Sequence, residues 1–415
     1  RELLENLSLK QAESGVARTE DEAVAVAQRI GYPLMVRPSF VLGGRAMAVI
    51  HHESELRRYI TESVSVSFNR PVLLDRFLDD AIEVDVDAVT DGKVVVIAGI
   101  TEHIEKAGVH SGDSSFLLPS QNLEPGLISE IVTTTKKLAI AGEVRGLMNV
   151  QYAVSKGVLY VLEVNPRASR SIPFVSKVVG VPWAKVAARV MAGETLEELD
   201  KLGVYGRILR FTDYVDAIKE VKFVASKEVV FPFIKFRGVD TVLGPEMRST
   251  GEVMGVDSSV GASFYKSQLA AGIRLPTSGK VFFSVRDSDK DSSIDIAKSL
   301  ETMGFELLAT SGTAKFLKSK GVKIDTINKV SEGSPHIVDA LNEGSISLVI
   351  NTPEGSGPLL DSKSIRSTAT SKGVPLYTTV AAAGAVVEGI KNHKSGKGKQ
   401  VFAIQKLLAD LNYLS

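Results

Sequence analysis

Apolar and polar positions along the first half of the chain alternate in the way that β-strands require. Two stretches contain a hairpin turn signal, Asp91-Gly92 in one and Lys156-Gly157 in the other. Helices are predicted over residues 17–30, with Thr19 as a suitable cap, and over residues 124–142. The predicted strands cover residues 32–38, 70–78, 82–105 and 148–166. This part of the chain is therefore expected to be α+β, with mainly antiparallel strands.

The pattern changes near residue 273, where short apolar strands begin to alternate with helices. Strands are predicted over residues 279–285, 305–310 and 346–352, and helices over 291–303, within 311–320 and over 401–412. This alternation is typical of a parallel, doubly wound α/β domain. The expected division is a first domain over residues 1–210, a mixed stretch over 211–272 and a second domain over 273–415.

Composition limits the classes of function. The 415 residues suit two or three domains, and 49 basic against 49 acidic residues give no general field for nucleic acid. The chain has no cysteine, which excludes disulfides, thiolate metal sites and a cysteine nucleophile, and suits a reducing, cytoplasmic location. No apolar run reaches the roughly 18–20 residues of a membrane span. Because residue 1 is Arg, we expect a fragment or a processed chain.

Polar residues at strand ends are the first candidates for chemistry. Arg37 ends one strand, and Gly43, Gly44 and Arg45 follow it, which suits the approach of an anion, although a plain turn is the alternative. Glu83, Asp85 and Asp87 share one strand face, where a solvated surface is the alternative.

Residues 102–115, EHIEKAGVHSGDSS, are expected to form a loop with many ionisable groups. His103 and His110 do not complete a histidine-type zinc site. A surface loop is the plain interpretation, and the density of charge makes a substrate loop more attractive.

The segment VLEVNPRASRS, residues 161–171, carries the most specific signal. Glu163 and Asn165 lie two residues apart and are expected on one strand face, together with Val161. The hairpin at Lys156-Gly157 brings Gln151 near them. Carboxylate and amide oxygens suit Mg²⁺ or Mn²⁺, and Arg167 and Arg170 can hold phosphate oxygens. This is the arrangement of a phosphoryl-transfer site; a structural ion-pair network is the alternative.

The second domain has a separate candidate site. A hydroxyl-rich turn, residues 310–313, leads into a helix, and such a helix start can bind phosphate. Ser284, Asn351 and Thr352 end strands, where open α/β sheets bind ligands. Charge could come from Lys290, Lys315 and Lys329. Ordinary helix capping is the alternative explanation of the turn.

At these motifs the chain resembles a known family. YPLMVRPSFVLGGRAM, DDAIEVDVDA, EHIEKAGVHSGDSS and EVNPRASRSIPFVSK are similar to the ATP-grasp domain in the C-terminal half of the carbamoyl phosphate synthetase large subunit. KVAARVMAG and GPEMRSTGEVMG extend the likeness, and the last part resembles the Rossmann-like, methylglyoxal-synthase-like domain that ends that subunit. The resemblance covers essentially the whole chain, and it implies that the first subdomain of the ATP-grasp half is cut off at the N-terminus.

The resemblance implies a role for each matching residue. The arginines Arg167 and Arg170, with His110, would act on the transferred phosphoryl group, and Gln151, Glu163 and Asn165 would bind metal. The nucleotide contacts would be Arg37, Asp75, Arg76, Leu78, Glu83, Gly108, Val109, His110, Ser111, Gln151 and Glu163. The effector nucleotide, UMP or IMP, would contact Ser284, Lys290, Thr310, Thr313, Lys329, Asn351 and Thr352. Ornithine, an effector of some members, would contact Glu105, Asp113, Glu228 and Thr378.

The implied reaction converts carbamate and ATP to carbamoyl phosphate and ADP, for pyrimidine and arginine biosynthesis. Mg²⁺ or Mn²⁺ is the expected cofactor, with K⁺ as a further candidate. The implied partners are the N-terminal remainder of the large subunit and a glutaminase small subunit, in an oligomer of heterodimers; neither nucleic acid nor a membrane is expected. The alternatives are a fragment that binds nucleotides without turnover, and another ATP-grasp ligase.

Overall fold

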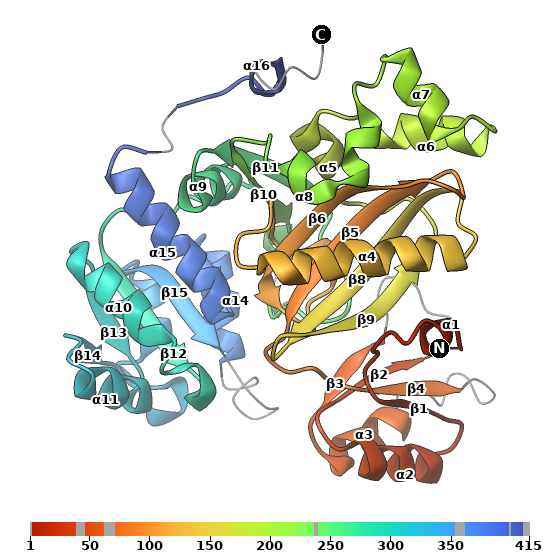
Figure 1. The fold of residues 1–415 in the computed structure, drawn as a ribbon. Helices are drawn as coiled ribbons and strands as arrows, with labels where there is room; N and C mark the ends of the chain where they lie inside the picture. Colours follow the sequence, from red (N-terminus) through yellow and green to blue (C-terminus); the bar gives the residue numbers. More distant parts are fainter. Residues whose placement is uncertain are drawn as a thin grey trace. The chain divides into compact units, whose positions relative to one another are not determined.

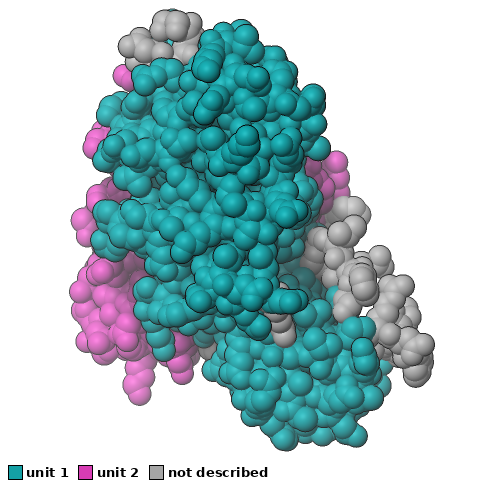
Figure 2. All heavy atoms as spheres, turned by 45° about the vertical axis from the view of Figure 1, so that its right-hand side comes forward, with its two compact units in different colours: residues 1–225, 244–247, 401–415 teal, residues 226–243, 248–400 magenta. Residues whose placement is uncertain are grey.

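The computed structural model describes residues 2–38, 46–61, 71–235, 240–352, 362–397 and 400–409. The chain forms two compact units, shown in Figures 1 and 2. The first unit comprises residues 1–225, 244–247 and 401–415, and the second comprises residues 226–243 and 248–400.

A small antiparallel sheet opens the first unit, with strand order β1-β4-β2-β3. Helix α2 begins after Thr19, whose side chain accepts a hydrogen bond from the Glu22 N–H at 3.2 Å, which confirms the predicted cap. Its buried residues pack with Leu34, Val36 and Leu74 of the sheet. The elements are α1 (Glu2–Asn6), β1 (Ser14–Ala17), α2 (Glu20–Ile30), β2 (Leu34–Pro38), β3 (Ala48–Ile50), α3 (Glu53–Tyr59) and β4 (Val72–Arg76). The predicted Gly43-Gly44-Arg45 turn lies outside the described residues.

The larger sheet of the first unit contains five neighbouring strands in the order β7-β6-β5-β8-β9. The pairs β5·β6, β5·β8, β6·β7 and β8·β9 are antiparallel, as the alternating pattern predicts. Lys156 and Gly157 both have positive φ, at 51° and 75°, so the two-residue turn between β8 and β9 is confirmed. The strands are β5 (Ile82–Thr90), β6 (Val95–Lys106), β7 (Phe116–Leu118), β8 (Gly146–Ser155) and β9 (Val158–Asn165).

One helix of the first unit, α4 (Pro125–Ala141), lies across the larger sheet (Figure 1). Helix α4 was predicted, whereas the four helices that follow β9 were not: α5 (Ile172–Val179), α6 (Trp183–Met191), α7 (Leu196–Leu202) and α8 (Tyr214–Ile218). Helix α16 (Ile404–Ala409) begins three residues later than the predicted 401–412, and residues 410–415 lie outside the described part. Helix α5 approaches β6 at Gly99, where a Cβ atom would lie 2.8 Å from Val175 Cγ1.

The second unit contains a five-stranded sheet in the order β14-β13-β12-β15-β16, and every pair is parallel, as predicted. Its core includes Phe282, Ile337, Leu341 and Val349. The strands are β12 (Lys280–Val285), β13 (Glu306–Ala309), β14 (Asp325–Thr326), β15 (Ile346–Thr352) and β16 (Leu376–Tyr377). The helices are α10 (Ser293–Thr302), α11 (Ser311–Ser319), α12 (Ile337–Asn342), α14 (Lys363–Ser371) and α15 (Val380–Lys394).

Before this parallel sheet, β10 (Val224–Val230) neighbours β11 (Gly251–Asp257), and helix α9 (Val260–Ala270) follows. In the part of the chain that the structure describes, no helix has the length and apolar character needed to cross a membrane.

Gly255 on β11 should be intolerant of any side chain, because a Cβ atom there would collide with the Ser263 carbonyl oxygen of α9. Backbone cannot move aside as a side-chain tip can. We expect Gly255→Ala to lower the free energy of unfolding by about 3 kcal/mol. Gly126 in α4 is the matched control: nothing lies within 4 Å of its Cβ position. Gly126→Ala should be neutral or stabilising by up to about 1 kcal/mol. Calorimetry of both variants measures the difference, and equal effects would contradict this packing.

Candidate active site on one face of the sheet

The register of three strands gathers polar side chains on one face of the sheet. Asp85 pairs with Gln151, which in turn pairs with Glu163. One row along, Asp87 pairs with Asn149, which pairs with Asn165. Directly opposed residues of paired strands share a face, so these six side chains lie together. The structure thus brings Gln151, Glu163 and Asn165 together, as the hairpin predicts.

A β-bulge corrects one detail of the sequence interpretation. Val161 pairs with Tyr152, but Glu163 pairs with Gln151, so Leu162 is the extra residue of β9. Because Gln151 and Tyr152 point to opposite faces of β8, Val161 and Glu163 also do. The expectation that Val161 shares the face of Glu163 is therefore wrong. Val161 is buried, whereas Glu163 is exposed.

The carboxylates of β5 do not form a solvated surface, and that alternative is wrong for Asp85 and Asp87. Asp85 is 4% exposed, and its Oδ2 lies 2.9 Å from His103 Nε2. The other ring nitrogen of His103 lies 3.4 Å from Glu83 Oε2, an ion-pair distance without hydrogen-bond geometry. Burial of the His103 ring lowers its pKa, but the two carboxylates outweigh this and raise the pKa to about 9. The ring is therefore positively charged at neutral pH.

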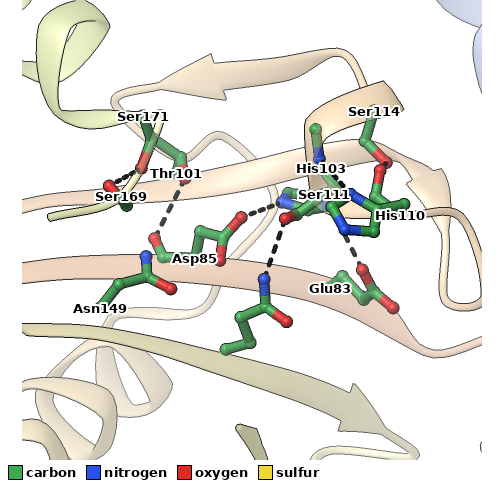
Figure 3. A network of polar contacts seen from close by, with 12 residues as sticks. Glu83, Asp85, Thr101, His103, His110, Ser111, Ser114, Asn149, Ser169 and Ser171 are labelled. Atoms are coloured by element: carbon green, nitrogen blue, oxygen red, sulfur yellow. Dashed lines mark hydrogen bonds and ion pairs between the residues drawn. The ribbon is translucent and has the colours of Figure 1, made fainter. Parts of the chain in front are cut away.

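Asp87 forms a second buried cluster on the same face. It is 1% exposed and accepts hydrogen bonds from Ser169 Oγ at 2.6 Å, from Ser171 Oγ at 2.5 Å and from Asn149 Nδ2 at 3.1 Å. Burial raises the pKa of the Asp87 carboxyl to about 6, although these hydrogen bonds act in the opposite direction. Figure 3 shows Asn149, Ser169 and Ser171 on one side of the network, and His103, His110 and Ser111 on the other.

The segment predicted as a loop over residues 102–115 is only partly a loop. Strand β6 continues to Lys106, so Glu102, His103 and Glu105 lie on a strand, which confirms the strand predicted up to residue 105 and corrects the predicted loop at these three residues. Beyond the strand, the Gly108 N–H donates to Glu83 Oε1 at 3.2 Å, and Gln151 Nε2 donates to Ser111 Oγ at 2.9 Å. These bonds fix residues 107–113 beside the polar face (Figure 3).

The two arginines follow β9 and are both exposed. Arg167 Nη2 donates to Asn165 Oδ1 at 3.3 Å. The guanidinium of Arg170 lies against Gly112: a Cβ atom there would be 2.8 Å from Nη2. It also contacts the Met247 sulfur. The segment after β9 and the loop before β7 therefore meet at Arg170.

The residues expected at adenine and phosphate lie where the small sheet joins the larger one. Arg37 pairs with Asp75 at 2.8 Å, and Arg76 donates to the Ile30 carbonyl at the end of α2. Leu78 is partly buried, and Val109 follows Gly108, whose Cβ position lies 2.9 Å from the Phe77 ring. The segment that carries Asp75 to Leu78 thus runs beside the loop that carries Gly108 and Val109.

The oxygen atoms of Gln151, Glu163 and Asn165 fit a hard cation such as Mg²⁺. The Gln151 amide nitrogen is used by Ser111, which leaves its oxygen to face a ligand, and the Glu163 carboxylate is exposed. Over the described ranges, no group of three or more His, Cys, Asp or Glu side chains is placed to hold a metal ion. The predicted set does not depend on such a group, because Glu163 is its only carboxylate.

A cavity of about 660 Å³ opens in the second unit. All seven residues expected to contact an effector nucleotide line it: Ser284, Lys290, Thr310, Thr313, Lys329, Asn351 and Thr352. Thr310 is the N-cap residue of α11, yet its side chain makes no capping hydrogen bond, so ordinary capping does not account for its hydroxyl. Lys290 pairs with Asp287 at 2.7 Å. Lys315, also considered from the sequence, is not among the lining residues.

A buried arginine beside the cavity was not predicted from the sequence. Arg366 of α14 is 0% exposed and binds Asp240 with two hydrogen bonds of 2.7 and 2.6 Å. It also donates to Asn351 Oδ1 at 3.2 Å and to Ser362 Oγ at 2.5 Å, and both of these residues line the cavity. Although burial favours the neutral acid, the hydrogen bonds from Arg366 lower the pKa of Asp240 overall.

The four residues expected to bind ornithine are divided between the units. Glu105 and Asp113 belong to the first unit, whereas Glu228 and Thr378 belong to the second. Glu105 Oε2 accepts the Ser115 N–H at 2.6 Å, and Glu228 accepts a hydrogen bond from Gln268. That these four residues form one ornithine site remains a prediction.

Some of the contacts that were not predicted carried a partial signal in the sequence. Asp85 and His103 flank the Asp91-Gly92 hairpin, so their meeting could have been inferred from pairing IEVDVDA with AGITEHI. No comparable signal joins Asp87 to Ser169 and Ser171, or Asp240 to Arg366, because long chain segments separate them.

Both parts of the chain match known protein families. Residues 1–199 match the family model for the carbamoyl-phosphate synthase L chain, ATP binding domain, and residues 292–378 match that for the MGS-like domain. The chain is 51% identical over 416 residues to "Carbamoyl phosphate synthase large chain, C-terminal section" of Aquifex aeolicus (strain VF5), covering 98% of this chain and 77% of that relative. This chain belongs to the carbamoyl phosphate synthase large-chain family. The resemblance inferred from the motifs is confirmed.

Full-length members of the carbamoyl phosphate synthase large-chain family are longer. The large chain of Neisseria meningitidis serogroup B is 52% identical over 408 residues, which are 98% of this chain and 36% of that relative. This chain therefore spans about a third of such a large chain.

The fold comparison agrees with the family. The biotin carboxylase domain of the Hydrogenobacter thermophilus 2-oxoglutarate carboxylase, solved with MgADP and bicarbonate, has a TM-score of 0.51 and 17% identity, over 65% of this chain and 63% of that one. Together with the MGS-like match and the parallel sheet, this confirms the predicted fold class: an ATP-grasp part followed by a Rossmann-like α/β part.

His103 should make stability depend on pH. Its folded pKa of about 9 exceeds the ordinary 6.5, so its contribution is complete below pH 6.5 and lost as pH rises through 9. We expect the free energy of unfolding to fall by about 3 kcal/mol over this window, relative to His103→Asn. Urea unfolding followed by the fluorescence of Trp183, the single tryptophan, measures it. The exposed control, His52→Asn, should keep the wild-type profile. If the free energy of unfolding had the same pH dependence in wild type and in His103→Asn, the His103 ring would not be charged as described.

Proposed function

We propose that this chain is the carbamate-phosphorylating part of a carbamoyl phosphate synthase, an ATP-dependent ligase. One observation carries the proposal: β8 and β9 place Gln151, Glu163 and Asn165 on one face of the sheet, and Arg167 and Arg170 follow directly. Membership of the large-chain family supports it, as does the match to the ATP binding domain. Its proposed pathways are pyrimidine and arginine biosynthesis, and its proposed location is the cytoplasm.

The proposed reaction transfers a phosphoryl group without a covalent protein intermediate. A carbamate oxygen forms a bond to the γ-phosphorus of ATP while the bond from that phosphorus to ADP breaks. The residues of this chain bind and orient the two substrates: Arg167 and Arg170 hold phosphoryl and carbamate oxygens, and the loop with His110 covers the phosphates. Exclusion of water protects carbamoyl phosphate from hydrolysis.

The nucleotide would lie between the small sheet and the polar face. Its proposed contacts include Arg37, Glu83 and the segments of residues 75–78 and 108–111. Mg²⁺ is the proposed cation, held by Gln151, Glu163 and Asn165, and its charge would offset that of the triphosphate. Mn²⁺ and K⁺ remain further candidates.

The second unit is proposed to regulate this activity. The cavity combines the lysines Lys290 and Lys329 with threonine hydroxyls and the N-terminus of α11, a set that suits the phosphate of a nucleoside monophosphate such as UMP or IMP. Ornithine, bound by Glu105, Asp113, Glu228 and Thr378, is a second proposed effector. The domain limits at residues 210 and 272 are part of this proposal.

The partners are also proposals. They are the N-terminal remainder of the large chain and a glutaminase small subunit, within an oligomer of heterodimers. The rival function is nucleotide binding without turnover by this part of the chain alone; assaying it beside a full-length large chain distinguishes the two.

Glu163→Gln should reduce phosphoryl transfer by about 10²–10³-fold, because the change removes the charge that holds the metal and leaves the side-chain shape. ATP formation from ADP and carbamoyl phosphate, with Mg²⁺ and a full-length large chain, measures it. Glu197→Gln on the exposed face of α7 is the matched control and should retain wild-type turnover. Normal metal-dependent turnover of Glu163→Gln would overturn the assignment of Glu163 on β9 as a metal ligand.

Lys329→Ala should weaken the binding of UMP or IMP about tenfold, because it removes a positive charge from the cavity lining. Isothermal titration of each nucleotide measures the affinity. Lys323→Ala removes an exposed lysine that does not line the cavity, and should leave the affinity unchanged. Equal loss in both variants would show that general charge, not the cavity, binds the nucleotide.

A further inference from the structure

We propose that Asp87 is a positioning residue for phosphoryl transfer: by holding Ser169 and Ser171, it fixes Arg170 between them toward the reacting phosphoryl group. The inference rests on the proposed function, because that function assigns Arg170 to the phosphoryl group. Asp87 itself would touch neither substrate.

Alternating burial of the segment after β9 is the first observation. Ser171 is buried and Ser169 partly buried, whereas Arg170 between them is exposed. Both hydroxyls donate to Asp87, one to each carboxylate oxygen, and they lie 2.7 Å from each other. Because Ser169 and Ser171 are both held by Asp87, the backbone between them is fixed. The Arg170 side chain therefore has few directions in which it can point.

The start of helix α5 supplies the second observation. Ser171 is the N-cap residue of α5, but its side chain makes no capping hydrogen bond. An N-cap serine ordinarily accepts a hydrogen bond from the first turn of its helix. Here the hydroxyl donates to Asp87 instead, and the carboxylate lies at the helix N-terminus, where negative charge is favoured. Packing of Val175 on Gly99 holds α5 to the sheet beside this contact.

The same carboxylate also contacts β8, the strand that carries Gln151 and pairs with β9. Asn149 donates to Asp87 Oδ1 and pairs in register with Asn165. Arg167, at the other end of the segment, donates to Asn165. Asp87 therefore holds the C-terminal end of the segment 165–171, and the pairing of β9 with β8 holds its N-terminal end. Hydrogen bonds to an ionised acceptor are stronger than neutral ones, which suits such a clamp.

A double-mutant cycle with Arg170→Ala tests whether Asp87 acts through this arginine. In a full-length large chain, Asp87→Asn should lower kcat for ATP formation by about 10–100-fold, since displacement of a catalytic group by about 1 Å has effects of this size. In the Arg170→Ala background the same change should cost less than about twofold. The dissociation constant of ADP should stay within about twofold in every variant, because the segment positions the phosphoryl group and not the nucleotide.

A second variant and a second readout keep the test decisive if Asp87→Asn does not fold correctly. Ser169→Ala/Ser171→Ala removes the same hydrogen bonds from the other side and should lower kcat similarly. Tryptic cleavage after Arg170, followed by mass spectrometry, should become several-fold faster in Asp87→Asn and in the serine variant. Asp91→Asn is the matched control: Asp91 is also a buried acid of the β5–β6 hairpin and accepts hydrogen bonds from Val94 and Leu196. It should lose stability but keep kcat and the slow cleavage.

The outcomes distinguish failure of the positioning role of Asp87 from failure of the proposed function. An equal effect of Asp87→Asn with and without Arg170, or unchanged cleavage after Arg170, overturns the positioning role and leaves the proposed function intact. An Arg170→Ala variant with wild-type kcat overturns the role of Arg170 itself. No phosphoryl transfer by the wild-type protein overturns the proposed function.

Discussion

The antiparallel register of β5, β8 and β9 is the constraint on which the candidate active site depends. Opposed residues share a face, so one row holds Asp85, Gln151 and Glu163, and the next holds Asp87, Asn149 and Asn165. A slip of one residue would turn each of these side chains to the apolar side of the sheet. The bulge at Leu162 lets β9 keep Val161 in the core and still present Glu163 to the polar face.

A polar face of this kind persists because its buried charges have partners. His103 offsets Asp85 and Glu83, and the hydroxyls after β9 satisfy Asp87. Removing charge from water without such partners costs several kcal/mol. These partners come from segments that also carry proposed substrate contacts. The contacts that satisfy the buried charges therefore also attach the residues on either side of Arg170, and the loop with His110, to the sheet.

The candidate ligand site of the second unit is formed by a parallel sheet and not by an antiparallel one. Its strands are parallel, so the ends of β12, β13 and β15 meet at one edge of the sheet and deliver Ser284, Thr310, Asn351 and Thr352 to one cavity. Arg366, fully buried, joins two lining residues to Asp240, on the segment between β10 and β11. A buried arginine can occupy such a position because a carboxylate holds it with two hydrogen bonds.

The sequence by itself determined the fold class, the two sheet types, the Lys156-Gly157 hairpin and the residues that β8 and β9 bring together, because periodicity and turn chemistry act over a few residues. Its motifs were also sufficient to indicate the family. Tertiary structure alone decided that Asp85 and Asp87 are buried, that a bulge separates Val161 from Glu163, and that Asp87 meets Ser169 and Ser171. Burial and long-range hydrogen bonds depend on which surfaces cover a strand, and that is settled only when distant segments pack together.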